Sequence, residues 1–348
     1  MSGGPQSEAV AAGRSPRPWQ VAVIGAGSWG TALALHAHRA GHEVRLWARR
    51  AELARRIIES RHNPDYLPGH LLSEQITVTA DHHRALAGAD LVLSVVPSRY
   101  LRSVWSQLAA EFPSAAHLVS ATKGLEESTG LRMTEVLQEY MGARAASLAA
   151  LSGPSFALEL AQEHPTAVTL GCTQPEAATE IQARLSHGPL RIYRNADIIG
   201  VEHGGALKNI IAVAAGVADG LGFGTNSRAA LITRGLKEVT ALAAARGAAP
   251  TTLMGLAGLG DLVLTCTGPL SRNRRVGVEL AQGRSMQKII GGMRMVAEGV
   301  ETVRAARGLG RAAGLEMPIT EQVYAILYEG KDPRVAIEDL MARQLVEE

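Results

Sequence analysis

Lys208 is the side chain in this sequence with the strongest case for acid–base chemistry. It lies in the stretch Gly204-Gly-Ala-Leu-Lys-Asn-Ile-Ile-Ala-Val213, which is otherwise apolar and has the spacing of a helix. A lysine in such a stretch either extends its ammonium to water or is held in a site, where desolvation or a nearby cation lowers its pKa. We therefore take Lys208 as the candidate proton donor, with a packed stem and an exposed ammonium as the alternative.

Lys123 and Asp261 are the polar residues that we expect beside Lys208. Lys123 follows a predicted strand at residues 117–121, and so lies at the carboxyl end of a parallel sheet, where ligands bind. A second ammonium there would help to lower the pKa of Lys208, while a loop lysine in solvent is the alternative. Asp261 follows Gly-Leu-Gly and is expected to orient Lys208 or a substrate hydroxyl, although an aspartate there is also an ordinary turn or helix-capping residue.

The segment Ser271-Arg272-Asn273-Arg274-Arg275 is the clearest polar cluster in the chain. It combines a hydroxyl, an amide and three guanidinium groups. A guanidinium can bind two oxygens of one carboxylate or phosphate in a bidentate contact. This composition predicts a clamp for an anionic group. An exposed basic turn or a nucleic-acid patch is the alternative, but no aromatic residues alternate with the arginines and the net charge is only +2, so nucleic acid is not expected as a partner.

A glycine-rich loop near the amino terminus has the pattern of a dinucleotide-binding site. A short apolar strand at residues 21–24 leads into Gly25-Ala-Gly-Ser-Trp-Gly30, and a helical run at residues 31–39 follows. In this pattern the first glycine permits a tight turn, the second lets the backbone approach the pyrophosphate, and the third allows close packing of helix on strand. A turn used only for packing is the alternative. The cofactor-binding residues expected here are Gly25, Gly27, Ser28, Trp29 and Gly30.

The residues after the second strand, 43–47, bear on the choice of cofactor. A site selective for NAD usually offers an acidic residue there to the ribose, whereas this chain has Ala48-Arg49-Arg50. Arg49 and Arg50 can pair with a 2′-phosphate. The expected cofactor is therefore NADP(H) or NAD(H), with NADP(H) slightly favoured, and two solvated surface arginines are the alternative.

The order of predicted elements divides the chain into two domains. Strands and helices alternate in the first half, with further strands expected at residues 91–96, 117–121, 166–170 and 190–193. Beyond Asp197 the sequence is rich in Ala, Leu and Gly and has helical spacing at residues 201–217, 226–246 and 297–313. We expect an α/β fold with a Rossmann-type, doubly wound, mostly parallel sheet at residues 19–198, followed by an all-α C-terminal domain at residues 199–348. Residues 1–18 read as a flexible tail.

Composition limits the class of protein. With 348 residues, 46% of them hydrophobic and 20% charged, the chain is expected to form soluble, folded domains. Cys172 and Cys266 form no Cys-x-x-Cys pair, which favours a reducing compartment, and no apolar run approaches the roughly 20 residues of a membrane span. The histidines show no recurring metal-ligand spacing. We expect a cytoplasmic protein with no integral membrane segment and no metal.

Six motifs in order give the chain a specific resemblance. From about residue 20 to about residue 330 it resembles the bacterial NAD(P)+-dependent glycerol-3-phosphate dehydrogenase family. The resemblance implies reversible hydride transfer between sn-glycerol 3-phosphate and dihydroxyacetone phosphate, supply of glycerol 3-phosphate for glycerophospholipid synthesis, a homodimer and a cytoplasmic role. The motifs are Gly25-Ala-Gly-Ser-Trp-Gly-Thr-Ala-Leu33, Ala121-Thr-Lys-Gly-Leu125, Ser152-Gly-Pro-Ser-Phe-Ala157, Gly205-Ala-Leu-Lys-Asn-Ile210, Gly258-Leu-Gly-Asp-Leu-Val-Leu-Thr-Cys266 and Ser271-Arg-Asn-Arg-Arg275.

The resemblance also assigns roles to individual residues. It makes Lys208 the general acid/base, with Lys123 and Asp261 as further catalytic residues. The substrate contacts that it implies are Lys123, Gly153, Ser155, Lys208, Asp261, Ser271, Arg272 and Asn273. The additional cofactor contacts that it implies are Lys123, Ala157, Arg272, Val296 and Glu298. This chain has Ala297 between the last two, a mild substitution that leaves their roles in place.

Two other functions remain open from the sequence. A 3-hydroxyacid-type dehydrogenase on the same two-domain plan would use the arginine cluster for a carboxylate. A dinucleotide sensor without catalytic activity would keep the glycine loop and signal through the helical half. Lys123, Lys208 and Asp261 argue against the sensor, and a substrate panel separates the two enzymes.

Overall fold

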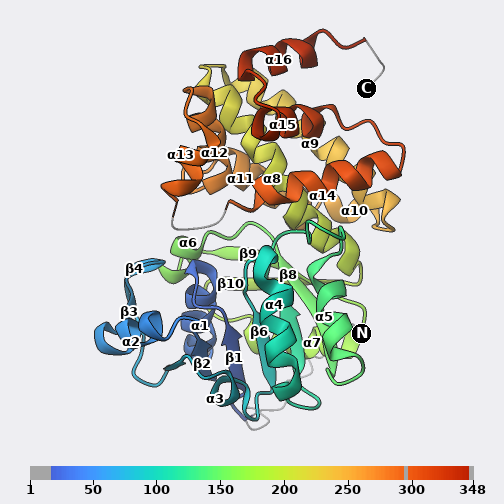
Figure 1. Cartoon of the computed structure of the whole chain (residues 1–348). Helices are drawn as coiled ribbons and strands as arrows, with labels where there is room; N and C mark the ends of the chain where they lie inside the picture. Colours follow the sequence, from blue (N-terminus) through green and yellow to red (C-terminus); the bar gives the residue numbers. More distant parts are fainter. Residues whose placement is uncertain (1–16, 294–296, 345–348) are drawn as a thin grey trace, which may run out of the picture.

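The computed structural model describes residues 17–293 and 297–344, which form a sheet-containing part and a helical part stacked on it (Figure 1). The predicted tail at residues 1–18 lies almost wholly outside the described residues. At its end, Arg17 pairs with Asp90 at 2.6 Å, so the chain contacts the sheet part from residue 17 onward.

The first part is built on an eight-stranded sheet flanked by helices. Its strands, with the short two-stranded pair β3–β4 beside them, are β1 (Gln20–Ile24), β2 (Glu43–Trp47), β3 (His62–Asn63), β4 (Leu67–Leu71), β5 (Thr77–Thr79), β6 (Leu91–Ser94), β7 (His117–Ser120), β8 (Ser147–Ser152), β9 (Thr166–Cys172) and β10 (Leu190–Asn195). Its helices are α1 (Ser28–Arg39), α2 (Ala51–Ser60), α3 (His82–Leu86), α4 (Ser98–Leu108), η1 (Ala109–Glu111), α5 (Met133–Met141), α6 (Ala157–Ala161) and α7 (Pro175–Leu185).

The strand order is β10-β9-β8-β7-β6-β1-β2-β5. All neighbouring strands are parallel except β8 and β9, so β9 and β10 run against the other six. The predicted mostly parallel, doubly wound sheet is therefore confirmed, with a reversal that the strand pattern did not reveal. The short α6 turns the chain back after β8, whereas a full crossover would have kept the next strand parallel. The chain order reverses between β1 and β6, where doubly wound folds bind ligands.

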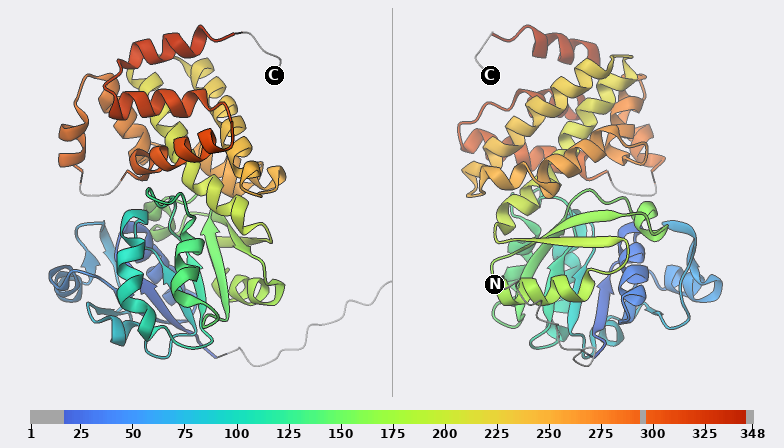
Figure 2. Two further views of the ribbon diagram at one scale, coloured as in Figure 1. Left: turned by 45° about the vertical axis from the view of Figure 1, so that its right-hand side comes forward. Right: turned by 180° about the vertical axis from the view of Figure 1, so that it is seen from behind.

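The second part consists of helices packed around one long helix. Its elements are α8 (Ile198–Gly220), α9 (Thr225–Ala245), α10 (Pro250–Leu253), η2 (Leu256–Gly260), α11 (Asp261–Thr267), α12 (Arg272–Ala281), α13 (Met286–Gly291), α14 (Glu298–Ala312), α15 (Pro318–Tyr328) and α16 (Pro333–Met341). Figure 2 shows these helices surrounding α8, whose lower end reaches the sheet part.

Helix α8 is central because it is buried almost along its whole length, with mostly apolar residues. Asp197 caps its first turn by accepting a hydrogen bond from the amide of Gly200 at 2.8 Å. By length and composition alone α8 would suffice to cross a membrane, as would residues 250–267 with α12 if counted as one bent span. In the structure 83% of the apolar window of α8 is buried inside the molecule, so its apolar surface is used for packing.

A buried polar cluster joins α8 to the sheet part. The carboxylate of Glu202 on α8 pairs with Arg132 at 2.5 Å and accepts a hydrogen bond from the amide of Thr134 at 2.9 Å. Burial raises the pKa of Glu202, while the Arg132 charge acts in the opposite direction. The cluster fixes the first two turns of α8 against the start of α5. It thereby fixes the position of Lys208, further along α8, relative to the sheet.

Helix α12 crosses α8 at backbone contact, and Gly277 makes this approach possible. A Cβ atom at Gly277 would lie 2.1 Å from the carbonyl oxygen of Val213 on α8 and 2.7 Å from the amide nitrogen of Val217. Neither backbone group can move aside without separating the two helices. This crossing therefore fixes the position of α12, including its first turn, relative to α8.

We expect Gly277→Ala to destabilise the protein by about 1–3 kcal/mol, because the added methyl overpacks the α8–α12 contact. Gly308→Ala is the matched control, since Gly308 lies in α14 with nothing within 4 Å of its Cβ position. The control should be neutral or stabilising by up to about 1 kcal/mol. Chemical unfolding of both variants measures the difference, and equal stability of the two would contradict the proposed contact.

Candidate active site

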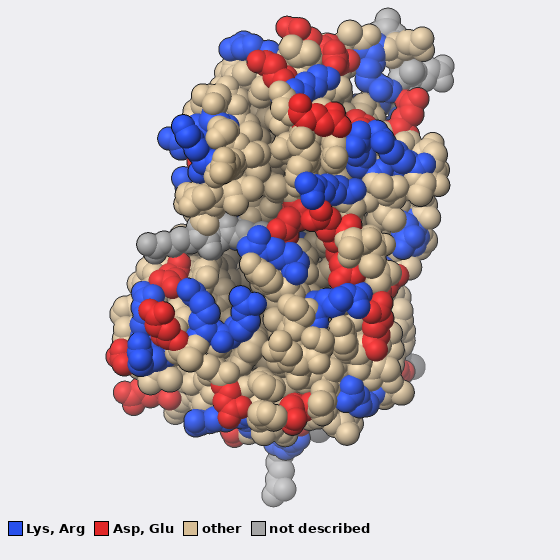
Figure 3. All heavy atoms as spheres, in the orientation of Figure 1, with Lys and Arg blue, Asp and Glu red and all other residues tan. Residues whose placement is uncertain are grey.

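A cleft of about 520 Å³ runs between the two parts and collects most of the residues that the sequence singled out. Its walls come from the glycine loop, the ends of β2, β6 and β7, and helices α8, α11, α12 and α14. In the space-filling view Lys and Arg side chains gather around the hollow between the two parts, with Asp and Glu side chains beside them (Figure 3).

The glycine loop fits a dinucleotide pyrophosphate. Gly25 has φ +120°, and a Cβ there would lie 2.6 Å from the carbonyl oxygen of Val95, so only glycine makes this turn. A Cβ at Gly27 would meet nothing within 4 Å, which leaves the loop backbone open to the cleft. Gly27 is also the N-cap of α1 and provides no side-chain cap, so the first amides of this helix face the cleft as donors for an anion.

The remaining loop residues also lie at the cleft. The hydroxyl of Ser28 donates to the carbonyl oxygen of Tyr66 at 2.6 Å, and Tyr66 lines the cleft beside it. The indole nitrogen of Trp29 is buried and has no hydrogen-bonded partner among the described residues. The predicted cofactor contacts of Ser28 and Trp29 remain predictions.

The structure separates the two arginines after β2. Arg50 already has protein partners, because it contacts Asp65 at 3.2 Å and the Tyr66 hydroxyl at 3.4 Å. Arg49 instead places its guanidinium 4.9 Å from the centroid of the Tyr100 ring and pairs with no carboxylate among the described residues. Arg49 is therefore the better placed of the two to receive a phosphate.

Asp261 holds both lysines in one buried group. Its carboxylate pairs with the ammonium of Lys208 through one oxygen and with that of Lys123 at 2.8 Å through the other. Lys208 also donates to the Thr265 hydroxyl at 2.8 Å, and that hydroxyl donates to the carbonyl oxygen of Asp261 at 2.6 Å. The sequence predicted the three charged residues as neighbours, but it assigned no role to Thr265, which lies one helical turn after Asp261 in the same motif.

Burial lowers the pKa of Lys208 to about 8. The negative charge of Asp261 opposes this shift, and the positive charge of Lys123 adds to it. The predicted exposed-ammonium alternative does not hold, because Lys208 is only 6% exposed. A lysine with this pKa can donate a proton near neutral pH and take it back.

The predicted clamp becomes the first turn of α12. Ser271 is the N-cap and its hydroxyl accepts from the Arg274 amide at 3.2 Å. Asn273 donates to the Asn209 side chain at 2.9 Å and accepts from the Gly299 amide at 3.0 Å. Ser271 and Asn273 thus position the helix start as well as lining the cleft. Asn209 was not anticipated, because an amide beside Lys208 has no distinctive spacing.

Arg272 projects from this turn into the cleft. It has no hydrogen-bonded partner among the residues that the structure describes, and its side chain remains accessible from the cleft. Protein atoms on its other sides desolvate the guanidinium and lower its pKa, but an arginine keeps its charge at neutral pH. A lone guanidinium beside a helix N-terminus is suited to a phosphate.

Glu298 begins α14 opposite Arg272. Burial raises its pKa to about 7, and the charge of Arg272 acts in the opposite direction. The carboxylate lines the cleft, as its predicted contact with the cofactor requires. Val296, predicted with it, lies outside the described residues.

The turn after β8 contributes through its backbone and one hydroxyl. Lys123 donates to the carbonyl oxygen of Gly153 at 2.8 Å and contacts the Ser155 hydroxyl at 3.3 Å. Ala157 packs against the sheet core and is not among the residues that line the cleft, whereas its neighbour Phe156 is. The predicted cofactor contact of Ala157 stays a prediction.

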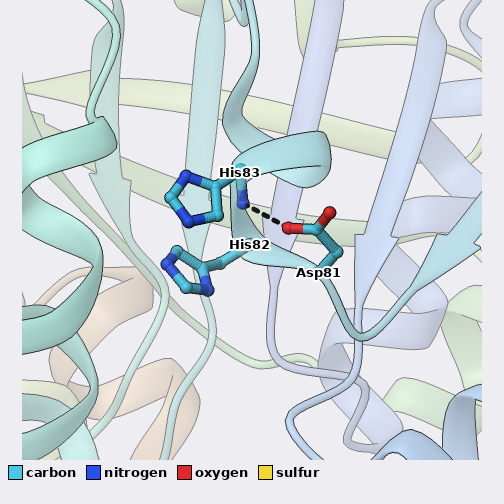
Figure 4. A group of neighbouring side chains, drawn as sticks. All are labelled: Asp81, His82 and His83. Atoms are coloured by element: carbon cyan, nitrogen blue, oxygen red, sulfur yellow. Dashed lines mark hydrogen bonds between the residues drawn. The ribbon is translucent and has the colours of Figure 1, made fainter.

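One group of potential metal ligands lies away from the cleft. Asp81, His82 and His83 can bring one ligand atom each within 4.8 Å of one another (Figure 4). The Asp81 carboxylate already caps α3, accepting from the amides of His83 and Arg84. The three residues are consecutive and largely exposed, so their proximity follows from the chain itself.

A Rossmann sheet, with the carboxyl ends of its strands facing a buried lysine on a second, helical domain, is the plan of a two-domain dinucleotide-dependent dehydrogenase. Comparison with known proteins makes this class specific. Family models for the N-terminus and C-terminus of NAD-dependent glycerol-3-phosphate dehydrogenase match residues 20–178 and 197–338. The chain belongs to this family.

Individual relatives agree over nearly the whole chain. A glycerol-3-phosphate dehydrogenase of Koribacter versatilis is 52% identical over 327 residues, covering 93% of this chain and 97% of the relative. That of Citrifermentans bemidjiense is 51% identical, covering 94% and 98%. The crystal structure of glycerol-3-phosphate dehydrogenase from Coxiella burnetii superposes with a TM-score of 0.90 at 38% identity, covering 94% of this chain and all of that one.

We expect Asp261→Asn to lower the pKa of Lys208 below about 8, because the variant loses the negative charge that raises it. With Lys208 as the predicted proton donor, kcat/KM for carbonyl reduction should fall as pH rises through about 8 in the unmodified protein and at lower pH in the variant. Asp90→Asn is the control, because Asp90 lies at the amino end of β6, away from the cleft. It should leave the pH profile of kcat/KM unchanged. An unshifted profile in Asp261→Asn would contradict the role of this carboxylate.

Proposed function

We propose that this protein catalyses reversible NAD(P)-dependent hydride transfer between sn-glycerol 3-phosphate and dihydroxyacetone phosphate, supplying glycerol 3-phosphate for glycerophospholipid synthesis. The observation that carries the proposal is the Asp261-centred lysine pair, which lies in one cleft between the dinucleotide loop and the first turn of α12. The test is oxidation of NADPH or NADH on addition of dihydroxyacetone phosphate.

Lys208 is proposed to carry the proton transfer of the reaction. A bound reduced nicotinamide would supply the hydride. As the carbonyl carbon of the substrate is reduced, Lys208 donates its proton to the carbonyl oxygen, and in the reverse direction neutral Lys208 accepts the hydroxyl proton. Lys123 places a second positive charge on the same carboxylate and stabilises negative charge that develops on the oxygen.

The phosphate end of the substrate is assigned to the start of α12. Arg272 supplies an accessible guanidinium, and the amides of the first turn supply further donors. Arg272 and Lys208 line the same cleft, and their chain neighbours Asn273 and Asn209 are hydrogen-bonded at 2.9 Å, so a substrate held by its phosphate at Arg272 is proposed to extend toward Lys208. Gly153, Ser155 and Asn273 are proposed to complete its contacts.

The other proposals concern the cofactor and the assembly. NADP(H) is proposed as the slightly preferred cofactor, because Arg49 presents a cation where an NAD-selective site would present a carboxylate. We also propose a division into domains at residue 198, a homodimer and a cytoplasmic location. The division is supported because one core cluster lies wholly before residue 198 and a second lies after it apart from Leu125. The other two proposals follow the family resemblance.

The two competing functions receive less support. A hydroxyacid dehydrogenase would share the fold, and ketopantoate reductase from Ralstonia eutropha does so with a TM-score of 0.58 at 18% identity, a likeness of fold alone. A dinucleotide sensor would have no use for a buried lysine with a pKa of about 8. A sensor would bind NADPH without oxidising it when dihydroxyacetone phosphate is added.

Lys208→Ala should fold, bind NADPH and lose at least roughly 10³-fold in kcat, because both the proton donor and its charge are removed. Lys208→Arg should not restore the rate, since a guanidinium does not release its proton near neutral pH. Lys237→Ala, an exposed lysine on α9, is the control. Stopped-flow measurement of hydride transfer, with NADPH binding followed separately by fluorescence, tests this, and near-normal transfer in Lys208→Ala would shift the acid role to Lys123.

Arg272→Ala should raise the KM for dihydroxyacetone phosphate by about 10- to 100-fold, because a charge-assisted contact is worth about 1.5–3 kcal/mol. The effect on dihydroxyacetone, which lacks the phosphate, should be much smaller. Arg275→Ala is the matched control, since Arg275 lies on the same helix and pairs with Glu279 outside the cleft. If both substrates lose the same factor, Arg272 serves the fold or the cofactor.

A further inference from the structure

A second arginine, Arg99, lies beside Arg49 in the cleft. Arg99 is on the first turn of α4, directly after β6, and its guanidinium carbon is 4.5 Å from the centroid of the Tyr100 ring. Arg49 lies 4.9 Å from the same ring. All three side chains line the cleft, so two cations from different strand ends meet on one aromatic side chain.

The topology places these residues at the adenosine end of a bound dinucleotide. Strand β1 lies between β2 and β6 in the sheet, and its end carries the glycine loop. A pyrophosphate on that loop directs the adenosine ribose toward the end of β2, where Arg49 lies. Arg99 approaches the same region from the end of β6 and contacts the ring that Arg49 contacts.

Arg99 already has a weak partner that a phosphate can replace. It pairs with Glu301 on α14 at 3.2 Å, and the arginine side chain is 43% exposed. Because the guanidinium is open to solvent, the pair contributes little to stability, although Glu301 itself is partly buried. A phosphate offers more negative charge and a geometry that matches the planar guanidinium. The second oxygen of Glu301 is buried without a hydrogen-bonded partner among the described residues, so this carboxylate is incompletely satisfied.

We propose that Arg99 is a second residue that selects for the adenosine 2′-phosphate of NADP(H), and that Glu301 competes with this phosphate for it. The inference rests on the proposed preference for NADP(H). When the phosphate binds, Arg99 exchanges the carboxylate of the helical domain for the phosphate, while Arg49 binds it from the β2 side. NADH lacks the 2′-phosphate and leaves the Arg99–Glu301 pair intact.

The experiment measures Kd for NADPH, NADH, 2′,5′-ADP and 5′-AMP on the full-length protein. Arg99→Ala should weaken NADPH and 2′,5′-ADP by about tenfold or more, the effect of one charge-assisted contact, and leave NADH and 5′-AMP nearly unchanged. Glu301→Gln should tighten only the two ligands with a 2′-phosphate. Arg102→Ala is the control, because Arg102 lies one turn further along α4 and pairs with Glu126 and Glu139.

The outcomes separate this inference from the proposal on which it rests. If Arg49→Ala reduces the preference for 2′-phosphorylated ligands and Arg99→Ala does not, the inference is overturned and the proposed preference stands. If neither variant changes the preference, both fail. Equal changes for NADPH and NADH in Arg99→Ala and Glu301→Gln would show that the ion pair acts on the arrangement of the domains, and would also overturn the inference.

Discussion

The carboxylate of Asp261, shared between two ammonium groups, is the interaction on which the cleft depends. The side chain is almost completely buried, and a buried carboxylate is costly unless opposite charges and hydrogen bonds satisfy both oxygens. Lys208 satisfies one oxygen from the helical part, and Lys123 satisfies the other from the end of β7. Each part of the molecule therefore supplies a charge that the other needs, and the position of the two lysines is fixed across the domain boundary.

The elements around Asp261 are built to hold that position. A π-helical turn, η2, immediately precedes it and places the carboxylate at the start of α11; such turns often occur at functional sites. Glu202 fixes α8 to α5, and Gly277 lets α12 approach the backbone of α8. Together these contacts set Lys208 and the first turn of α12 relative to the sheet, although none of them touches the space where ligands would bind.

The same physical cause moves the pKa values of two groups of opposite charge toward neutral pH. Burial disfavours the charged form of both, so it lowers the pKa of Lys208 to about 8 and raises that of Glu298 to about 7. Cations line the cleft beyond them, with Arg49 toward the adenosine region and Arg272 at the start of α12. The N-termini of α1 and α12 both face this space, so the cleft favours anions at two separate places.

The sequence by itself determined the elements and the chemistry that nearby residues encode. The glycine loop, the strand that precedes Lys123, the cluster at Ser271 and the helical second half follow from local spacing, because turns, strands and helices depend on residues close in the chain. The tertiary structure decided what depends on distant residues. It reversed β9 and β10, gave Lys208 its acceptor Thr265, and paired Arg50 with Asp65 while leaving Arg49 on Tyr100. These outcomes could not be predicted from the sequence, because they depend on which distant side chains the packing brings together. The burial that shifts the pKa of a group depends on the same packing.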